Sequence, residues 1–93
     1  MRMRFIARGI VQGVNFRAAT AREAAARGLH GRVWNRDDGA VEVVAEGDAS
    51  GLDELGQWLE QGPRSARVEQ VERSAVAGED RYTDFDIAWR APE

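Results

Sequence analysis

The turn sequence Asp37-Asp38-Gly39 restricts the fold of this chain more than any other short segment. It separates two stretches that read as strands, residues 31–37 and 40–46, and in the second one Val41 and Val43 alternate with their neighbours. Alternation with a period of two is typical of half-buried strands, and Asp-Gly between two such strands is a strong hairpin signal. We therefore expect an antiparallel strand pair in the middle of the chain.

A helix is expected on each side of this hairpin. Residues 17–27 are rich in alanine and lack Gly and Pro, and Gly28 stands where a helix commonly ends. Residues 50–61 carry apolar side chains at helical spacing, with Asp48 or Ser50 as candidate caps and Gly62-Pro63 as terminator. The residues expected to face the core are Ala21, Ala24, Ala25 and Leu29 for the first helix, and Leu52, Leu55, Trp58 and Leu59 for the second.

Further strands are expected outside the helices. Residues 2–11 alternate as a first strand; Val68, Val71, Ala75 and Val76 belong to a fourth; and Phe85, Ile87 and Trp89 form a short last one. The order βαββαβ predicts an α+β fold, a ferredoxin-like α/β sandwich in which two helices cover one face of an antiparallel sheet. At 93 residues without linker or repeat, we expect a single domain spanning residues 1–93.

Composition excludes several classes of function. The chain has no cysteine and one histidine, His30, which excludes a disulfide framework, a thiol nucleophile and a Cys- or His-rich zinc site. A net charge of −3 gives no electrostatic footprint for nucleic acid. Residues 1–10 lack the apolar run of a signal peptide, and no segment is as apolar as a membrane span. We expect a cytoplasmic monomer without metal, cofactor, membrane or nucleic-acid partner.

The segment Val11–Arg17, VQGVNFR, joins the first strand to the first helix. Backbone N–H groups at a helix N-terminus lack helical partners and carry the positive end of the dipole, so they suit an anion. Gly13 lets the backbone approach a ligand closely, and Arg17 has the guanidinium that grips phosphate oxygens. The loop has no Ser, Cys, His or carboxylate, and it matches neither nucleotide-binding glycine motif. Taken alone, it is more often an ordinary turn.

A second segment, GRVWNRDDG, contains Asn35 just before the hairpin. An amide at that place is more often a turn residue than a catalytic one. Arg32 and Arg36 read as solvated charges at the strand end, and His30 as a residue at the start of the strand. Trp34 packs either on the open face of the sheet or near the mouth of a site.

Together, residues 11–17 and 31–42 resemble the two signature segments of the acylphosphatase family. The resemblance continues through Gly47, the helix bearing Leu55 and Leu59, and residues 62–71, as far as Phe85. It implies an enzyme that hydrolyses the carboxyl–phosphate bond of acyl phosphates to a carboxylate and inorganic phosphate, without metal or phosphoenzyme. It also implies that Arg17 binds phosphate and Asn35 orients water, and that a phosphate-binding loop is formed by Gln12, Gly13, Val14, Asn15 and Phe16.

The chain departs from the family pattern at three places. The family usually has Arg where this chain has Ile10, a small or aromatic residue where it has Asn15, and its Trp two positions before Trp34. We expect these differences to tune substrate access and rate, with Asn15 placed to fill or hydrogen-bond within the loop. They also keep open an alternative, a non-catalytic phosphate- or acyl-phosphate-binding or regulatory domain. An RNA-binding module on the same topology is disfavoured by the acidic balance.

Overall fold

Five strands and two helices follow one another in the predicted order in the computed structural model, which describes residues 1–78 and 81–89. No helix among these described residues is long and apolar enough to cross a membrane. The elements are β1 (Arg2–Ile10), α1 (Phe16–Ala26), β2 (His30–Asn35), β3 (Val41–Glu46), α2 (Ala49–Gln61), β4 (Arg67–Ala75) and β5 (Phe85–Ile87).

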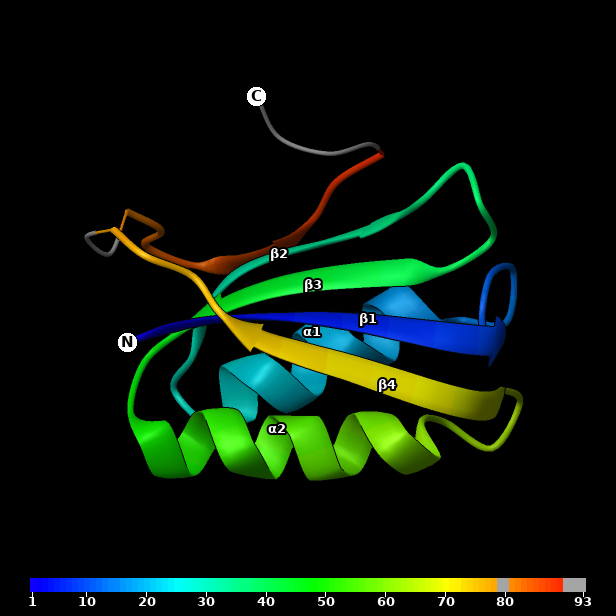
Figure 1. Cartoon of the computed structure of the whole chain (residues 1–93), viewed down its shortest axis with the longest axis horizontal. Helices are drawn as coiled ribbons and strands as arrows, with labels where there is room; N and C mark the ends of the chain where they lie inside the picture. Colours follow the sequence, from blue (N-terminus) through cyan, green and yellow to red (C-terminus); the bar gives the residue numbers. More distant parts are fainter. Residues whose placement is uncertain (79–80, 90–93) are drawn as a thin grey trace.

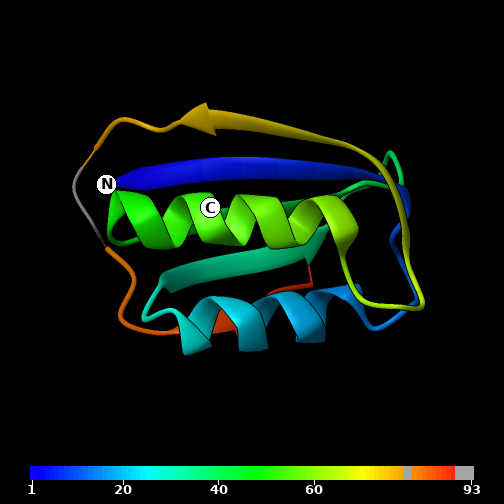
Figure 2. The same ribbon diagram turned by 90° about the horizontal axis from the view of Figure 1, so that it is seen from below.

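The strands form one sheet in the order β4-β1-β3-β2-β5, and both helices lie on the same face of it (Figure 1). Seen from the helix side, α2 covers the β4–β1 part and α1 covers the β2–β5 part (Figure 2). The expected ferredoxin-like sandwich is confirmed. One detail differs, because β5 pairs with β2 in parallel and makes an otherwise antiparallel sheet mixed.

Several element ends differ from the sequence prediction for local reasons. Strand β2 stops at Asn35 because Arg36 already belongs to the turn, where its N–H donates to the Ala40 carbonyl at 2.8 Å. Strand β5 stops at Ile87, so Trp89 is not part of it. The Asp48 cap position is confirmed, although its side chain makes no capping hydrogen bond.

The buried face of α1 is rotated from the one expected. The buried residues are Phe16, Ala19, Thr20 and Ala24, whereas Ala25 is exposed. Phe16 begins the helix and inserts its ring into the core beside Trp58, with 6.2 Å between ring centroids. That anchor fixes the helical phase, since positions three, four and eight residues later share its side of the helix. Gly28 ends the helix with a left-handed φ of 70°, as expected.

A buried carboxylate, Glu46, holds the segment that leads into β5. Its side chain is 2% exposed. It accepts hydrogen bonds from Arg2 Nε at 2.8 Å and from the backbone N–H groups of Arg81 and Tyr82 at 2.9–3.0 Å. Burial raises the pKa of this carboxyl, but the hydrogen bonds from Tyr82, Arg81 and Arg2 outweigh it, and the pKa lies below its ordinary value of 4.5.

Replacing Glu46 should therefore destabilise the protein in a pH-dependent way. A group whose pKa is lowered by folding stabilises the native state above its ordinary pKa and loses that contribution as pH falls through the lowered value. We expect Glu46→Gln to lower the free energy of unfolding by about 2 kcal/mol near neutral pH, with the difference shrinking below pH 4.5. Urea unfolding of both proteins across this range measures it.

Glu60→Gln is the matched control, because Glu60 is exposed on α2 and its replacement should change stability by less than about 0.5 kcal/mol. A Glu46→Gln difference that stays constant from neutral to acidic pH would contradict the linkage.

Candidate active site

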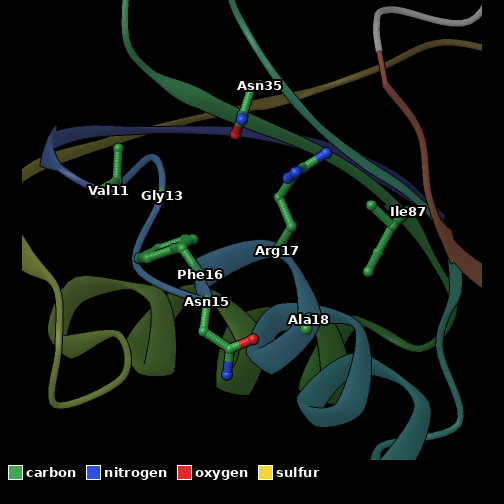
Figure 3. A pocket seen from close by; sticks show the side chains of 8 residues that line it. All are labelled: Val11, Gly13, Asn15, Phe16, Arg17, Ala18, Asn35 and Ile87. Atoms are coloured by element: carbon green, nitrogen blue, oxygen red, sulfur yellow. The ribbon is translucent and has the colours of Figure 1, made fainter.

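A small pocket lies at the end of the sheet where strands β1 and β2 finish and helix α1 begins (Figure 3). Its volume is about 130 Å³, well below the roughly 300–1,000 Å³ of pockets that enclose drug-sized ligands. It therefore suits a small group such as an oxyanion rather than a nucleotide. The lining residues are Val11, Gly13, Asn15, Phe16, Arg17, Ala18, Asn35 and Ile87.

The floor of the pocket is the uncapped N-terminus of α1. The first helical hydrogen bond runs from the Ala19 N–H to the Asn15 carbonyl at 3.1 Å, so the N–H groups of Phe16, Arg17 and Ala18 have no helical acceptor. No side chain caps this end. Gly13 has a left-handed φ of 74° and open space where a side chain would stand, which leaves the backbone approachable. These donors and the helix dipole favour an anion.

Asn15 does not fill the loop, contrary to expectation. It has a φ of 64°, a left-handed conformation that Asn adopts more readily than other residues with a side chain. Its side chain is exposed and points away from Arg17 and Asn35 (Figure 3). In this conformation Asn15 stands at the N-cap position without capping, so it leaves the helix donors unoccupied.

Arg17 reaches into the pocket from the first turn of α1 (Figure 3). Its Nη1 donates to the Ala88 carbonyl at 3.3 Å, and its guanidinium lies 5.4 Å from the centroid of the Trp89 ring. Within residues 1–78 and 81–89 it makes no ion pair with a carboxylate. A positive charge therefore faces the pocket without an acidic partner among these residues.

Asn35 faces Arg17 from the end of β2. Alternation along the strand puts it on the same face as the buried Val33, whereas Trp34 is buried on the opposite face, away from the pocket. Its Oδ1 is buried without a hydrogen-bond partner in the described structure and points into the pocket (Figure 3). Because buried polar atoms are nearly always paired, this oxygen marks a place for a water or ligand donor.

Two residues predicted for the phosphate-binding loop hold it from outside the pocket. The Gln12 side chain donates to the carbonyls of Arg36 and Ala40 at 2.7 and 2.9 Å, which fastens the loop to the hairpin. The Val14 carbonyl accepts the Ser65 hydroxyl at 2.5 Å, which fastens it to the segment before β4. Neither residue lines the pocket. The backbone amides assigned to them stay a prediction.

Several arginines outside the pocket are paired with carboxylates. Arg36 bonds Asp38 and Glu42, so it is not simply a solvated charge, contrary to expectation, and Arg8 on β1 bonds Asp38 and Glu72. The hydrogen bonds from Arg36 and the Ala40 N–H, with a smaller one from Arg8, lower the pKa of Asp38 to about 2. Arg32 likewise pairs with Asp84 at 2.9 Å. Arg17 therefore differs in kind from these neighbours.

Other residues singled out by the sequence lie away from the pocket. Ile10 is 59% exposed at the end of β1 and does not line it, and His30 starts β2 at the end opposite Asn35. Sequence reasoning missed Ile87, Ala88 and Trp89. The apolar alternation at Phe85 and Ile87 predicts a strand, but it does not predict that this strand pairs with β2 and reaches the pocket.

The lining residues have a defined chemical capacity. They supply backbone N–H donors, a guanidinium and an amide oxygen, but no hydroxyl, thiol, imidazole or carboxylate among the residues that the structure describes. Such a site binds an oxyanion and a water molecule. It has no side chain suited to act as nucleophile or general acid.

Comparison with known proteins gives a consistent result. The family model described as Acylphosphatase matches residues 3–87. An acylphosphatase of Pasteurella multocida (strain Pm70) is 47% identical over 96% of this chain and 99% of its own length. One of Xanthomonas euvesicatoria pv. vesicatoria (strain 85-10) is 53% identical over 80% of this chain and 84% of its own. The crystal structure of acylphosphatase from Bacillus subtilis superposes with a TM-score of 0.90 at 34% identity, covering 95% and 98% of the two chains.

The left-handed backbone at Asn15 predicts unequal effects for two small replacements. Asn15→Gly should leave stability and activity near those of the parent, since glycine adopts φ above zero without cost. Asn15→Ala should lower the free energy of unfolding by about 1 kcal/mol. Urea unfolding followed by tryptophan fluorescence checks both. Equal stability of the two variants would contradict the left-handed conformation, and loss of activity in a stable Asn15→Gly protein would show that the amide contacts substrate.

Proposed function

This chain belongs to the acylphosphatase family, and we propose that the pocket in Figure 3 is its active site. The chain hydrolyses acyl phosphates to a carboxylate and inorganic phosphate. We assign phosphate binding to Arg17 and to the backbone amides of residues 12–16, and orientation of the attacking water to Asn35.

One observation supports this assignment above all. The guanidinium of Arg17, the open N-terminus of α1 and the unpartnered Oδ1 of Asn35 converge on a single space of about 130 Å³. The first two attract a dianionic phosphoryl group, and the third accepts a hydrogen bond from a water molecule beside it. Phosphoryl transfer needs mainly positioning and stabilisation of charge on the equatorial oxygens, and these groups supply both.

The proposed hydrolysis needs no nucleophile from the protein, because water attacks the phosphorus directly. The water oxygen forms a bond to phosphorus as the bond from phosphorus to the acyl oxygen breaks, and the carboxylate leaves with that electron pair. One proton of the water passes to a phosphate oxygen of the substrate, because the described lining residues include no side-chain base. A carboxylate with a pKa of about 4 leaves without protonation, so a general acid is unnecessary.

The proposal requires one chain only. The net charge of −3 offers nothing to attract nucleic acid. We accordingly propose a monomer that acts on small molecules in the cytoplasm.

Removing the guanidinium should abolish most of the activity without unfolding the protein. We expect Arg17→Ala to lower kcat/KM for acetyl phosphate about 100- to 1,000-fold, with a chelator present throughout, and to weaken binding of inorganic phosphate. Arg17→Lys should recover part of the affinity, since it keeps the charge but loses the two-pronged geometry. Arg22→Ala, an exposed arginine on the same helix, is the control. Parent-like turnover by Arg17→Ala would refute the assignment.

Asn35→Ala should separate turnover from binding. Without the amide oxygen the water loses its orientation, so we expect kcat to fall about 100-fold while the inhibition constant of inorganic phosphate changes less than about twofold. Steady-state kinetics with phosphate as inhibitor measures both. Equal losses in turnover and phosphate affinity would instead make Asn35 a binding or structural residue.

A further inference from the structure

The two residues that follow β5 hold the catalytic guanidinium in an otherwise open pocket. The Ala88 carbonyl accepts from Arg17 Nη1 at 3.3 Å, and the Ala88 N–H donates to the Val33 carbonyl at 2.8 Å. Val33 lies on β2 two residues before Asn35. A short chain of hydrogen bonds thus connects Arg17 to the strand that carries its partner in the proposed mechanism.

Trp89 completes this arrangement from the solvent side. Its side chain is 87% exposed, and the Arg17 guanidinium lies 5.4 Å from the ring centroid, within the range of a cation–π contact. Leaving so large an apolar side chain in water offers the fold no burial in return. Within the described residues, this ring interacts with Arg17 alone, which points to a role in the site.

Both groups that contact Arg17, the Ala88 carbonyl and the Trp89 ring, are uncharged, and this favours the binding of phosphate. A carboxylate beside Arg17 would position the guanidinium equally well, but it would neutralise the charge and compete with phosphate. A carbonyl and an aromatic face position the group and leave its charge intact. The hydrogen bond of 3.3 Å is also long for N–H···O, so the shorter charge-assisted bonds that phosphate offers easily replace it.

We propose that Ala88 and Trp89 form a neutral clamp that holds Arg17 ready for phosphate, with Trp89 as a positioning residue. The inference rests on the proposed role of Arg17. Holding the side chain before binding removes part of the conformational entropy that binding would otherwise cost, so the clamp strengthens the binding of phosphate and of substrate alike. Such uniform binding lowers KM and leaves kcat unchanged.

Inorganic phosphate is the decisive probe, because it has no acyl group. We expect Trp89→Leu, which keeps an apolar side chain but no aromatic face, to weaken phosphate binding about 2- to 5-fold in calorimetry. KM for acetyl phosphate should rise by the same factor at unchanged kcat. Trp89→Phe should restore most of the affinity. Trp89→Asp should weaken phosphate more than Trp89→Leu, and added salt should reduce that excess because it screens the new ion pair.

The alternatives give different results. If Trp89→Leu leaves phosphate affinity unchanged, the clamp is refuted; if KM then rises for benzoyl phosphate alone, Trp89 is a wall for the acyl group instead. Arg17→Ala distinguishes this failure from failure of the proposed function. Loss of phosphate affinity in Arg17→Ala without loss in Trp89→Leu refutes the clamp only, whereas retained affinity in Arg17→Ala refutes the site itself. Thermal melting confirms that each variant is folded.

Discussion

A guanidinium at the N-terminus of a helix is electrostatically unfavourable, and the pocket is built around that conflict. Arg17 and the open donors of α1 bring positive charge to one small space, with no carboxylate beside them in the described part of the chain. The fold tolerates this because the energy involved is modest in water, about 1 kcal/mol or less. In the proposed site, a phosphoryl group removes this conflict when it binds. We therefore propose that part of the affinity for substrate comes from relief of an unfavourable arrangement that the free protein maintains.

Maintaining that arrangement requires a rigid loop, and the surrounding elements supply it. Gln12 ties the loop to the hairpin, and Ser65 ties it to the segment before β4. Phe16 anchors the start of α1 in the core. The left-handed turn at Asn15 leaves the first N–H groups of the helix uncapped, and its side-chain amide points away from Arg17 and Asn35. The contacts made by Gln12 and Ser65 lie outside the pocket, so they leave its lining free for the ligand.

The sequence predicted the fold, because the fold depends on local patterns, and the two residues that the family resemblance singled out, Arg17 and Asn35, line one pocket. Alternation, the Asp-Gly turn, one alanine-rich stretch and one amphipathic stretch suffice to predict βαββαβ. What it did not predict depends on contacts between distant segments. The phase of α1 follows from where the Phe16 ring inserts, and the parallel pairing of β5 follows from Glu46 holding Tyr82. The sequence also predicts wrongly that Trp89 belongs to the last strand, because alternation alone does not show where the pairing with β2 ends.

The net negative charge of the protein makes the local positive charge at Arg17 important for attracting an anion. At −3 overall, the net charge of the protein does not attract an anionic substrate, so in the proposed site recognition depends on the groups within a few ångströms of Arg17. Arg8, Arg32 and Arg36 contribute little, because they do not line the pocket and are bound to carboxylates. A site of this kind selects for a compact phosphoryl group rather than for negative charge in general. It also leaves the acyl group unspecified by charge, and Ile87 is an apolar lining residue that we propose distinguishes one acyl phosphate from another.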